Sequence, residues 1–160
     1  HDYIRTQASN MQQNIGDPPG VSGWSAYYQE PQFHELWINA DTLPRRNQFS
    51  DVMIGNGYTR NGKKINIDIL AFASTLSDPA NPNTLINESL EILFTIDITQ
   101  QVRDFLKSIL LSGQTSDSYW TDAWVTYKAN TSNTTNRNIV LNRLQSMYKY
   151  LMNLPEYQLS

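Results

Sequence analysis

Apolar residues recur at three- and four-residue spacing through the second half of this chain, and this pattern constrains the fold more than any other feature. The stretches Leu85 to Phe94, Val102 to Leu110 and Val140 to Leu154 all show it. Such spacing places the apolar side chains on one face of an α-helix, which must then pack against another apolar surface. We therefore predict an all-α fold, an irregular bundle of about five helices.

Capping and breaking residues set the limits of these helices. Asn81-Pro82-Asn83 suits the start of one helix and Thr99 the start of the next, which Gly113 ends. Pro155 ends the last helix, because a residue that precedes proline disfavours helical backbone. A further helix carries Trp120, Trp124 and Tyr127. The core residues predicted from the helical faces are Leu90, Leu93, Phe94, Phe105, Leu106, Ile109, Trp124, Leu144, Tyr148 and Leu151.

An earlier helix is predicted from Asn39 or Asp41 to about Met53, because either of the first two residues can cap it. Pro44 is tolerated because it falls in the first turn. The C-terminal half of this helix is expected to bury Phe49, Val52 and Met53.

The stretch between Gly55 and Ala73 supports two interpretations. The alternation of Ile65, Ile67 and Ile69 after the Asn61-Gly62 turn signal indicates a short extended segment, whereas Ile69 to Ala73 equally suits a buried helix. Residues 57 to 64 also have the spacing of a phosphate-binding loop, but the final hydroxyl position is occupied by Lys64. No buried strand precedes the motif, so we interpret it as a turn.

Composition excludes several classes of function. The 160 residues suit one domain, and the formal charge of -3 with scattered basic residues argues against nucleic acid as a partner. No apolar run approaches the roughly 20 residues that span a bilayer. Cysteine is absent, which excludes disulfides, zinc thiolates and thiol nucleophiles. We predict no metal and no cofactor.

The segment from Pro18 to Trp37 is rich in aromatic residues and in turn-forming proline and glycine. We predict a structured loop whose candidate binding residues are Trp24, Tyr27, Tyr28 and Trp37. Burial of all four as a small satellite core is the interpretation that aromatic side chains favour, and a platform for a sugar ring or a peptide is its alternative. We expect Trp24 and Trp37 to be buried anchors, and Tyr27 and Tyr28 to be exposed to a partner or a glycan.

Catalytic candidates are few. His34 is the single internal histidine, and with Asp41 and Arg45 it forms the weak catalytic set that this sequence offers. A surface role for each of the three is the alternative. The chain starts without an initiator Met or a signal peptide, so we interpret residues 1–160 as the C-terminal fragment of a longer protein.

Three separated motifs carry a family resemblance. They are Pro18-Pro19-Gly20-Val21-Ser22-Gly23-Trp24, the segment Leu36 to Phe49 with its Trp-Ile-Asn and Arg-Arg-Asn-Gln-Phe parts, and the tail Leu151 to Leu159. Together they resemble the C-terminal region of the domain of unknown function 1800 family. The chain departs from that pattern by inserting residues 25 to 35, where members usually have a short Gly-rich link.

This resemblance implies a mostly helical, bacterial, exported protein whose N-terminal part is missing here. Members often lie beside genes for sulfatase-like exported proteins, which implies envelope or polymer metabolism. The family has no established catalytic residues. Two hypotheses follow: a non-catalytic helical module that completes a larger exported protein and binds a partner or glycan, or a hydrolase-like active site shared with the missing N-terminal region. The sequence does not decide whether the protein is an enzyme.

Overall fold

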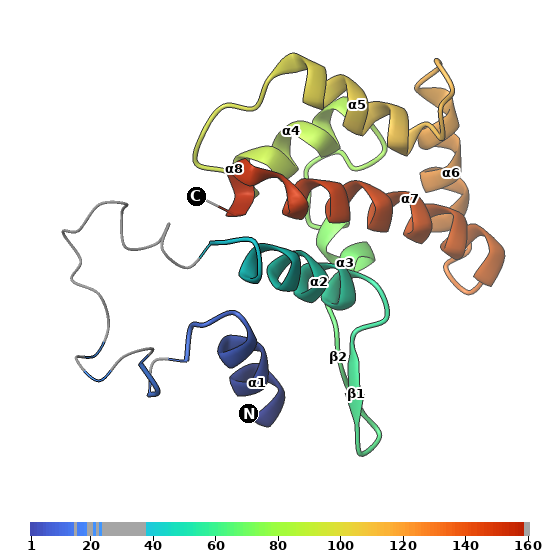
Figure 1. The fold of residues 1–160 in the computed structure, drawn as a ribbon. Coiled ribbons are helices and arrows are strands. Elements are labelled where there is room, and N and C mark those ends of the chain that lie inside the picture. The colour runs from blue at the N-terminus through green and yellow to red at the C-terminus, as the bar shows by residue number, and fades with distance from the viewer. Residues whose placement is uncertain (15, 19–20, 22, 24–37, 159–160) are drawn as a thin grey trace.

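The computed structural model describes residues 1–14, 16–18, 21, 23 and 38–158, which form eight helices and one two-stranded sheet (Figure 1). The elements are α1 (Asp2–Asn10), α2 (Thr42–Ile54), β1 (Tyr58–Arg60), β2 (Lys63–Ile65), α3 (Ile69–Ala73), α4 (Pro82–Leu93), α5 (Gln100–Leu110), α6 (Ser118–Ala129), α7 (Thr134–Asn153) and α8 (Pro155–Gln158). The all-α fold class is confirmed. The five predicted helices correspond to α2, α4, α5, α6 and α7, whereas the short helices α1 and α8 were missed.

Helix α7 is the centre of the architecture. It contacts α2, α3, α5, α6 and α8, and Figure 1 shows it crossing the middle of the molecule with α5 on one side and α2 on the other. Its four-three apolar spacing explains this position, because the buried side chains run along the whole helix. They are Val140, Leu144, Met147, Tyr148 and Leu151.

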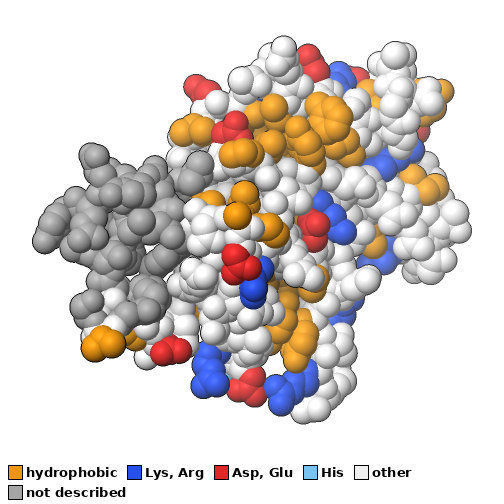
Figure 2. Space-filling view, viewed as in Figure 1, with side chains coloured by type: hydrophobic (Ala, Val, Ile, Leu, Met, Phe, Trp, Pro, Cys, Tyr) orange, Lys and Arg blue, Asp and Glu red, His pale blue; other side chains and the backbone are white. Residues whose placement is uncertain are grey.

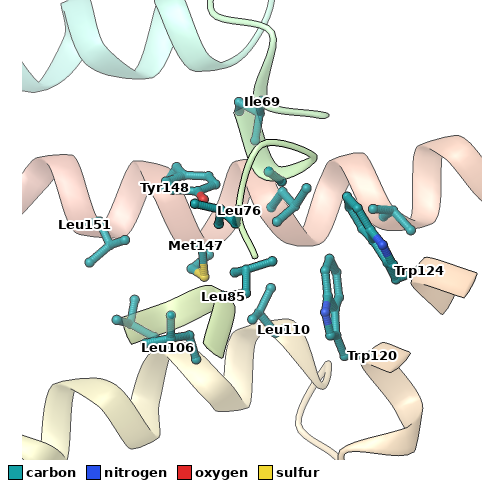
Figure 3. Close-up of a cluster of buried hydrophobic side chains, with 14 of the residues drawn as sticks. Ile69, Leu76, Leu85, Leu106, Leu110, Trp120, Trp124, Met147, Tyr148 and Leu151 are labelled. Carbon is teal, nitrogen blue, oxygen red and sulfur yellow. The ribbon is translucent and has the colours of Figure 1, made fainter. Parts of the chain in front are cut away.

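The core lies where α4, α5 and α6 face α7. Figure 3 shows Leu85, Leu106 and Leu110 converging on the same space as Met147, with Trp120 and Trp124 closing one end. Leu85, Leu106, Leu110 and Met147 are completely buried. The two tryptophan rings are 5.7 Å apart, within the range of favourable aromatic pairs.

Helix starts follow the predicted capping residues in part. The Asn81 side chain accepts hydrogen bonds from the backbone N–H groups of Asn83 and Thr84, as an N-cap should. Thr99 occupies the N-cap position of α5, but its side chain makes no capping bond. At the end of α5, Ser112 takes the left-handed conformation (φ 54°) and Gly113 N–H donates to the carbonyl of Ser108, which together close the helix.

The phosphate-loop-like stretch forms a β-hairpin, and a turn at its centre agrees with the turn interpretation. Asn61 and Gly62 both have positive φ (51° and 72°), the requirement of the two-residue type I′ turn. Strands β1 and β2 pair antiparallel across this turn. The extended interpretation is correct for Lys63–Ile65 and the helical one for Ile69–Ala73, which Asp68 caps through the N–H of Ala71.

Three core predictions need correction. Phe105 is 48% exposed rather than buried, because it lies at the edge of the α5 face that turns toward Leu106 and Leu110. Leu93 and Ile109 are half-buried and pack against the core; the other seven predicted core residues are buried.

Helix α2 also differs from expectation, since Phe49, Val52 and Met53 are half-buried and its buried residues are Thr42, Ser50 and Ile54.

Candidate functional site

A groove of about 780 Å³ lies along the contact between α2 and α7. Its apolar wall comes from the start of α2, and amide side chains come from both helices and from the turn after α2. The residues that carry its chemistry are Leu43, Pro44, Asn47, Gln48, Asp51, Val52, Asn56, Gln145 and Lys149. On the face shown in Figure 2, acidic and basic side chains lie next to each other between α2 and α7.

Two side-chain hydrogen bonds hold the walls of the groove together. Gln145 Nε2 on α7 donates to the carbonyl of Ile54 at 3.0 Å, and this bond satisfies a carbonyl at the end of α2. Asn153 Nδ2 donates to Asp51 Oδ1 at 3.2 Å. Both bonds join residues about a hundred positions apart, so the geometry of the groove depends on the packing of the two helices.

Lys149 lies over the glycine that follows α2. A Cβ atom at Gly55 would be 3.4 Å from Lys149 Nζ and 2.9 Å from the carbonyl oxygen of Asp51. Glycine therefore leaves room for both the helix end and the ammonium group. Among the residues that the structure describes, Lys149 takes part in no ion pair, so its charge is free to meet a ligand.

The lining of the groove suits hydrogen bonding better than acid–base chemistry. Four amide side chains line the groove, and those of Gln48 and Asn56 are exposed with donors and an acceptor, whereas Gln145 Nε2 already donates to Ile54 and Asn47 Oδ1 is buried. Asp51 is the single carboxylate among the lining residues. Glycoside hydrolysis by the usual mechanism needs two carboxyl groups that face one bond. The groove can therefore bind a hydroxyl-rich or amide-rich ligand, and its lining does not supply that catalytic pair.

The structure brings two of the predicted catalytic residues together, in an ion pair. Arg45 Nη2 lies 3.0 Å from Asp41 Oδ1, with the side chains 45% and 57% exposed at the start of α2. This i,i+4 pair is a surface contact of the kind that contributes little to stability. His34, the third member, lies outside the described residues. So do the aromatic candidates Trp24, Tyr27, Tyr28 and Trp37, and all five remain predictions.

Sequence reasoning missed the groove. Gln145 and Lys149 lie on the polar side of a helix that was recognised by its apolar side, and nothing in their spacing links them to Asn47 or Asp51. One signal was available: Gly55 follows a helix that carries no other glycine, and close backbone approach is a common reason for glycine at such a place.

Within the described ranges, no group of three or more His, Cys, Asp or Glu side chains could hold a metal ion. None of the helices described is long and apolar enough to cross a bilayer.

Comparison with known proteins identifies a family. The family model described as "Protein of unknown function (DUF1800)" matches residues 1–159, nearly the whole chain. No curated protein and no solved structure matches.

Proposed function

Because the chain belongs to the DUF1800 family, whose function is unknown, we propose a function from the α2–α7 groove: a non-catalytic helical module that binds a glycan there. The module would complete a larger exported bacterial protein and pack against the N-terminal part of that protein. The observation that carries the binding proposal is the set of four amide side chains around the apolar wall of Leu43, Pro44 and Val52.

The chemistry of a sugar matches this lining. Sugar hydroxyls both donate and accept hydrogen bonds, and amide side chains do the same in a fixed plane. The C–H faces of a sugar ring need apolar contact, which the wall of the groove offers. The aromatic residues predicted to bind a partner or glycan end at Trp37, just before α2 in the sequence, and their part in binding is a separate prediction.

Binding is tested by titrating the protein with a panel of neutral oligosaccharides and following backbone amide shifts by NMR. We expect shifts at Gln48, Asn56 and Gln145. Gln48→Ala and Asn56→Ala should each weaken binding by about five- to tenfold, as expected for a lost hydrogen bond of about 1 kcal/mol. Both side chains are exposed, so neither change should unfold the protein. Gln101→Ala, an exposed amide on α5 outside the groove, is the matched control.

The same titration separates this proposal from its rivals. Shifts confined to other surfaces, or equal losses in the Gln101→Ala control, would reject the groove as the site. Mass spectrometry of the oligosaccharides after incubation tests the enzyme hypothesis with His34, Asp41 and Arg45 as contributors. Cleavage that Asp41→Asn abolishes would replace the binding module by the shared active site. Fractionation of cells that express the full-length protein tests the exported location.

A further inference from the structure

The β-hairpin carries an unusual concentration of positive charge. Three of the twelve Lys and Arg residues of the chain lie in the five positions from Arg60 to Lys64, although the chain as a whole has a net charge of -3. Figure 2 shows basic side chains at the end of this face where Figure 1 places the hairpin and the start of α1.

The register of the hairpin sorts these charges onto two faces. Arg60 pairs with Lys63 and Tyr58 with Ile65, so these four side chains share one face, while Lys64 and its partner Thr59 lie on the other. Two like charges directly opposite each other destabilise a strand pair. The arrangement of Arg60 and Lys63 therefore costs folding free energy that the fold itself does not explain.

The face with two cations is hollowed and packs against α1. Tyr3 of α1 stacks on Tyr58 with the ring centroids 3.9 Å apart and the rings 10° from parallel. Beside this stack lies a pocket of about 350 Å³, whose walls are formed by His1, Asp2, Tyr3, Tyr58, Arg60, Lys63 and Ile65. The pocket thus combines aromatic and aliphatic contact area with cationic donors.

One acidic side chain, Asp2, neutralises this pocket only in part. Asp2 pairs with Arg60 at 2.9 Å, but the two side chains are 78% and 57% exposed, so solvent weakens the contact. Lys63 makes no ion pair with any residue that the structure describes. One full positive charge is therefore available at the rim.

We propose that this face of the hairpin binds an acidic sugar, with the anionic group between Arg60 and Lys63 and the ring over Tyr58 and Ile65. Guanidinium and ammonium groups hold a carboxylate or phosphate by charge-assisted hydrogen bonds. Aromatic and aliphatic side chains cover the C–H face of the ring. The site is separate from the α2–α7 groove and does not depend on it.

The test uses the chain of 160 residues and NMR titration with glucuronate, glucose 6-phosphate, glucose and inorganic phosphate. We expect one or both acidic sugars to bind, with shifts at Tyr3 and from Tyr58 to Ile65. Comparing glucuronate with glucose 6-phosphate shows whether the site takes a carboxylate or a phosphate. Arg60→Gln and Lys63→Gln should each reduce affinity about three- to fivefold, the loss of one solvent-screened ion contact. Lys64→Gln removes the same charge from the opposite face and should change affinity little.

A variant that is expected to bind more tightly distinguishes a lost contact from a misfolded protein. Asp2→Asn removes the carboxylate that competes for Arg60 and should strengthen binding, an outcome that unfolding cannot mimic. The proposal fails if Lys64→Gln weakens binding as much as Lys63→Gln, because the attraction would then be diffuse. It also fails if glucose or inorganic phosphate binds as tightly as the acidic sugars, or if no acidic sugar shifts the hairpin resonances.

Discussion

At the scale of single residues, Leu106 and Phe105 are chain neighbours with opposite environments. Leu106 is fully buried beneath α7, whereas Phe105 is 48% exposed and touches Tyr150 with ring centroids 4.7 Å apart. Leu106→Ala should lower the free energy of unfolding by about 2–5 kcal/mol, through lost burial and the cavity left behind. Urea denaturation followed by circular dichroism measures this change.

Phe105→Ala is the matched control, since the position loses more side-chain volume but much of it already faces water. We expect a loss clearly smaller than that of Leu106→Ala. Equal losses would show that the apolar side chains gathered over α5 and α7 in Figure 2 are part of the core.

Tyr148 links stability to pH. Burial raises the pKa of Tyr148 to about 12 from its ordinary value of 10.0, although the hydrogen bond with Ser89 lowers it somewhat. A group whose pKa is higher in the folded state stabilises the fold below its unfolded pKa. That contribution disappears as the pH rises from 10 through 12, and it amounts to roughly 3 kcal/mol for a shift of about two pKa units.

Tyr148→Phe should therefore remove much of the alkaline loss of stability. Its cost near neutral pH should be about 1 kcal/mol, because the Ser89 hydroxyl keeps its bond to the carbonyl of Leu85 at 2.7 Å. Urea melts at pH 8, 10 and 11.5 compare the variant with the wild type. Tyr119→Phe, at a 49% exposed position, controls for the loss of a phenol hydroxyl outside the core. If the unfolding free energy of Tyr148→Phe fell with rising pH as steeply as that of the wild type, Tyr148 would not be the cause of the alkaline loss of stability.

At the scale of elements, two helices with N-cap residues of similar chemistry begin differently. Asn133 accepts hydrogen bonds from the N–H groups of Thr135 and Asn136 at the start of α7, whereas the side chain of Thr99 makes no cap bond for α5. Asn133→Ala should cost about 1 kcal/mol. Thr99→Ala should cost only a few tenths, because no bond is lost. Thermal melts of the two variants measure this difference. A larger loss of stability in Thr99→Ala than in Asn133→Ala would contradict the prediction.

Helices α4 to α7 were predictable from sequence because each buries apolar side chains at helical spacing, and the turn at Asn61-Gly62 because this pair favours type I′ geometry. Helix α2 was predicted from the residues that can begin it, since two of its three buried residues are polar. Helix α1 was not, since none of its residues is buried and its polar sequence has no apolar face to detect. Phe105 was misplaced for a related reason. Periodicity identifies the side of α5 that faces the core, but the position of α7 decides where that side ends.

At the scale of the whole molecule, the candidate sites depend on packing that no local pattern records. The groove requires α2 and α7 to lie side by side, and the acidic-sugar pocket requires Tyr3 to reach Tyr58 across 55 positions. Two features were within reach of sequence reasoning: the glycine after α2, and the two cations opposite each other once the two-residue turn fixes the hairpin register. The roles predicted for Trp24, Tyr27, Tyr28 and Trp37 concern residues outside the described ranges and stay predictions.

The central position of α7 predicts how stability is distributed over the molecule. Unfolding α7 removes the contacts of five other helices at once, so its amides can exchange with solvent only when the whole bundle opens. Helix α1 has no buried residue and packs only on α2 and, through Tyr3, on the hairpin, among the elements that the structure describes, so it can detach while the core persists.

Native-state hydrogen exchange should therefore show the slowest amides between Leu144 and Leu151, with opening free energies equal to that of global unfolding. Amides of α1 should exchange with much lower opening free energies, and those of the hairpin should lie between because β1 and β2 hold each other. Leu106→Ala should lower the opening free energy of the α7 amides by the amount it lowers global stability, and should leave α1 unchanged. If α1 proves as protected as α7, the N-terminal helix is part of the cooperative core, and the hierarchy inferred from burial is wrong.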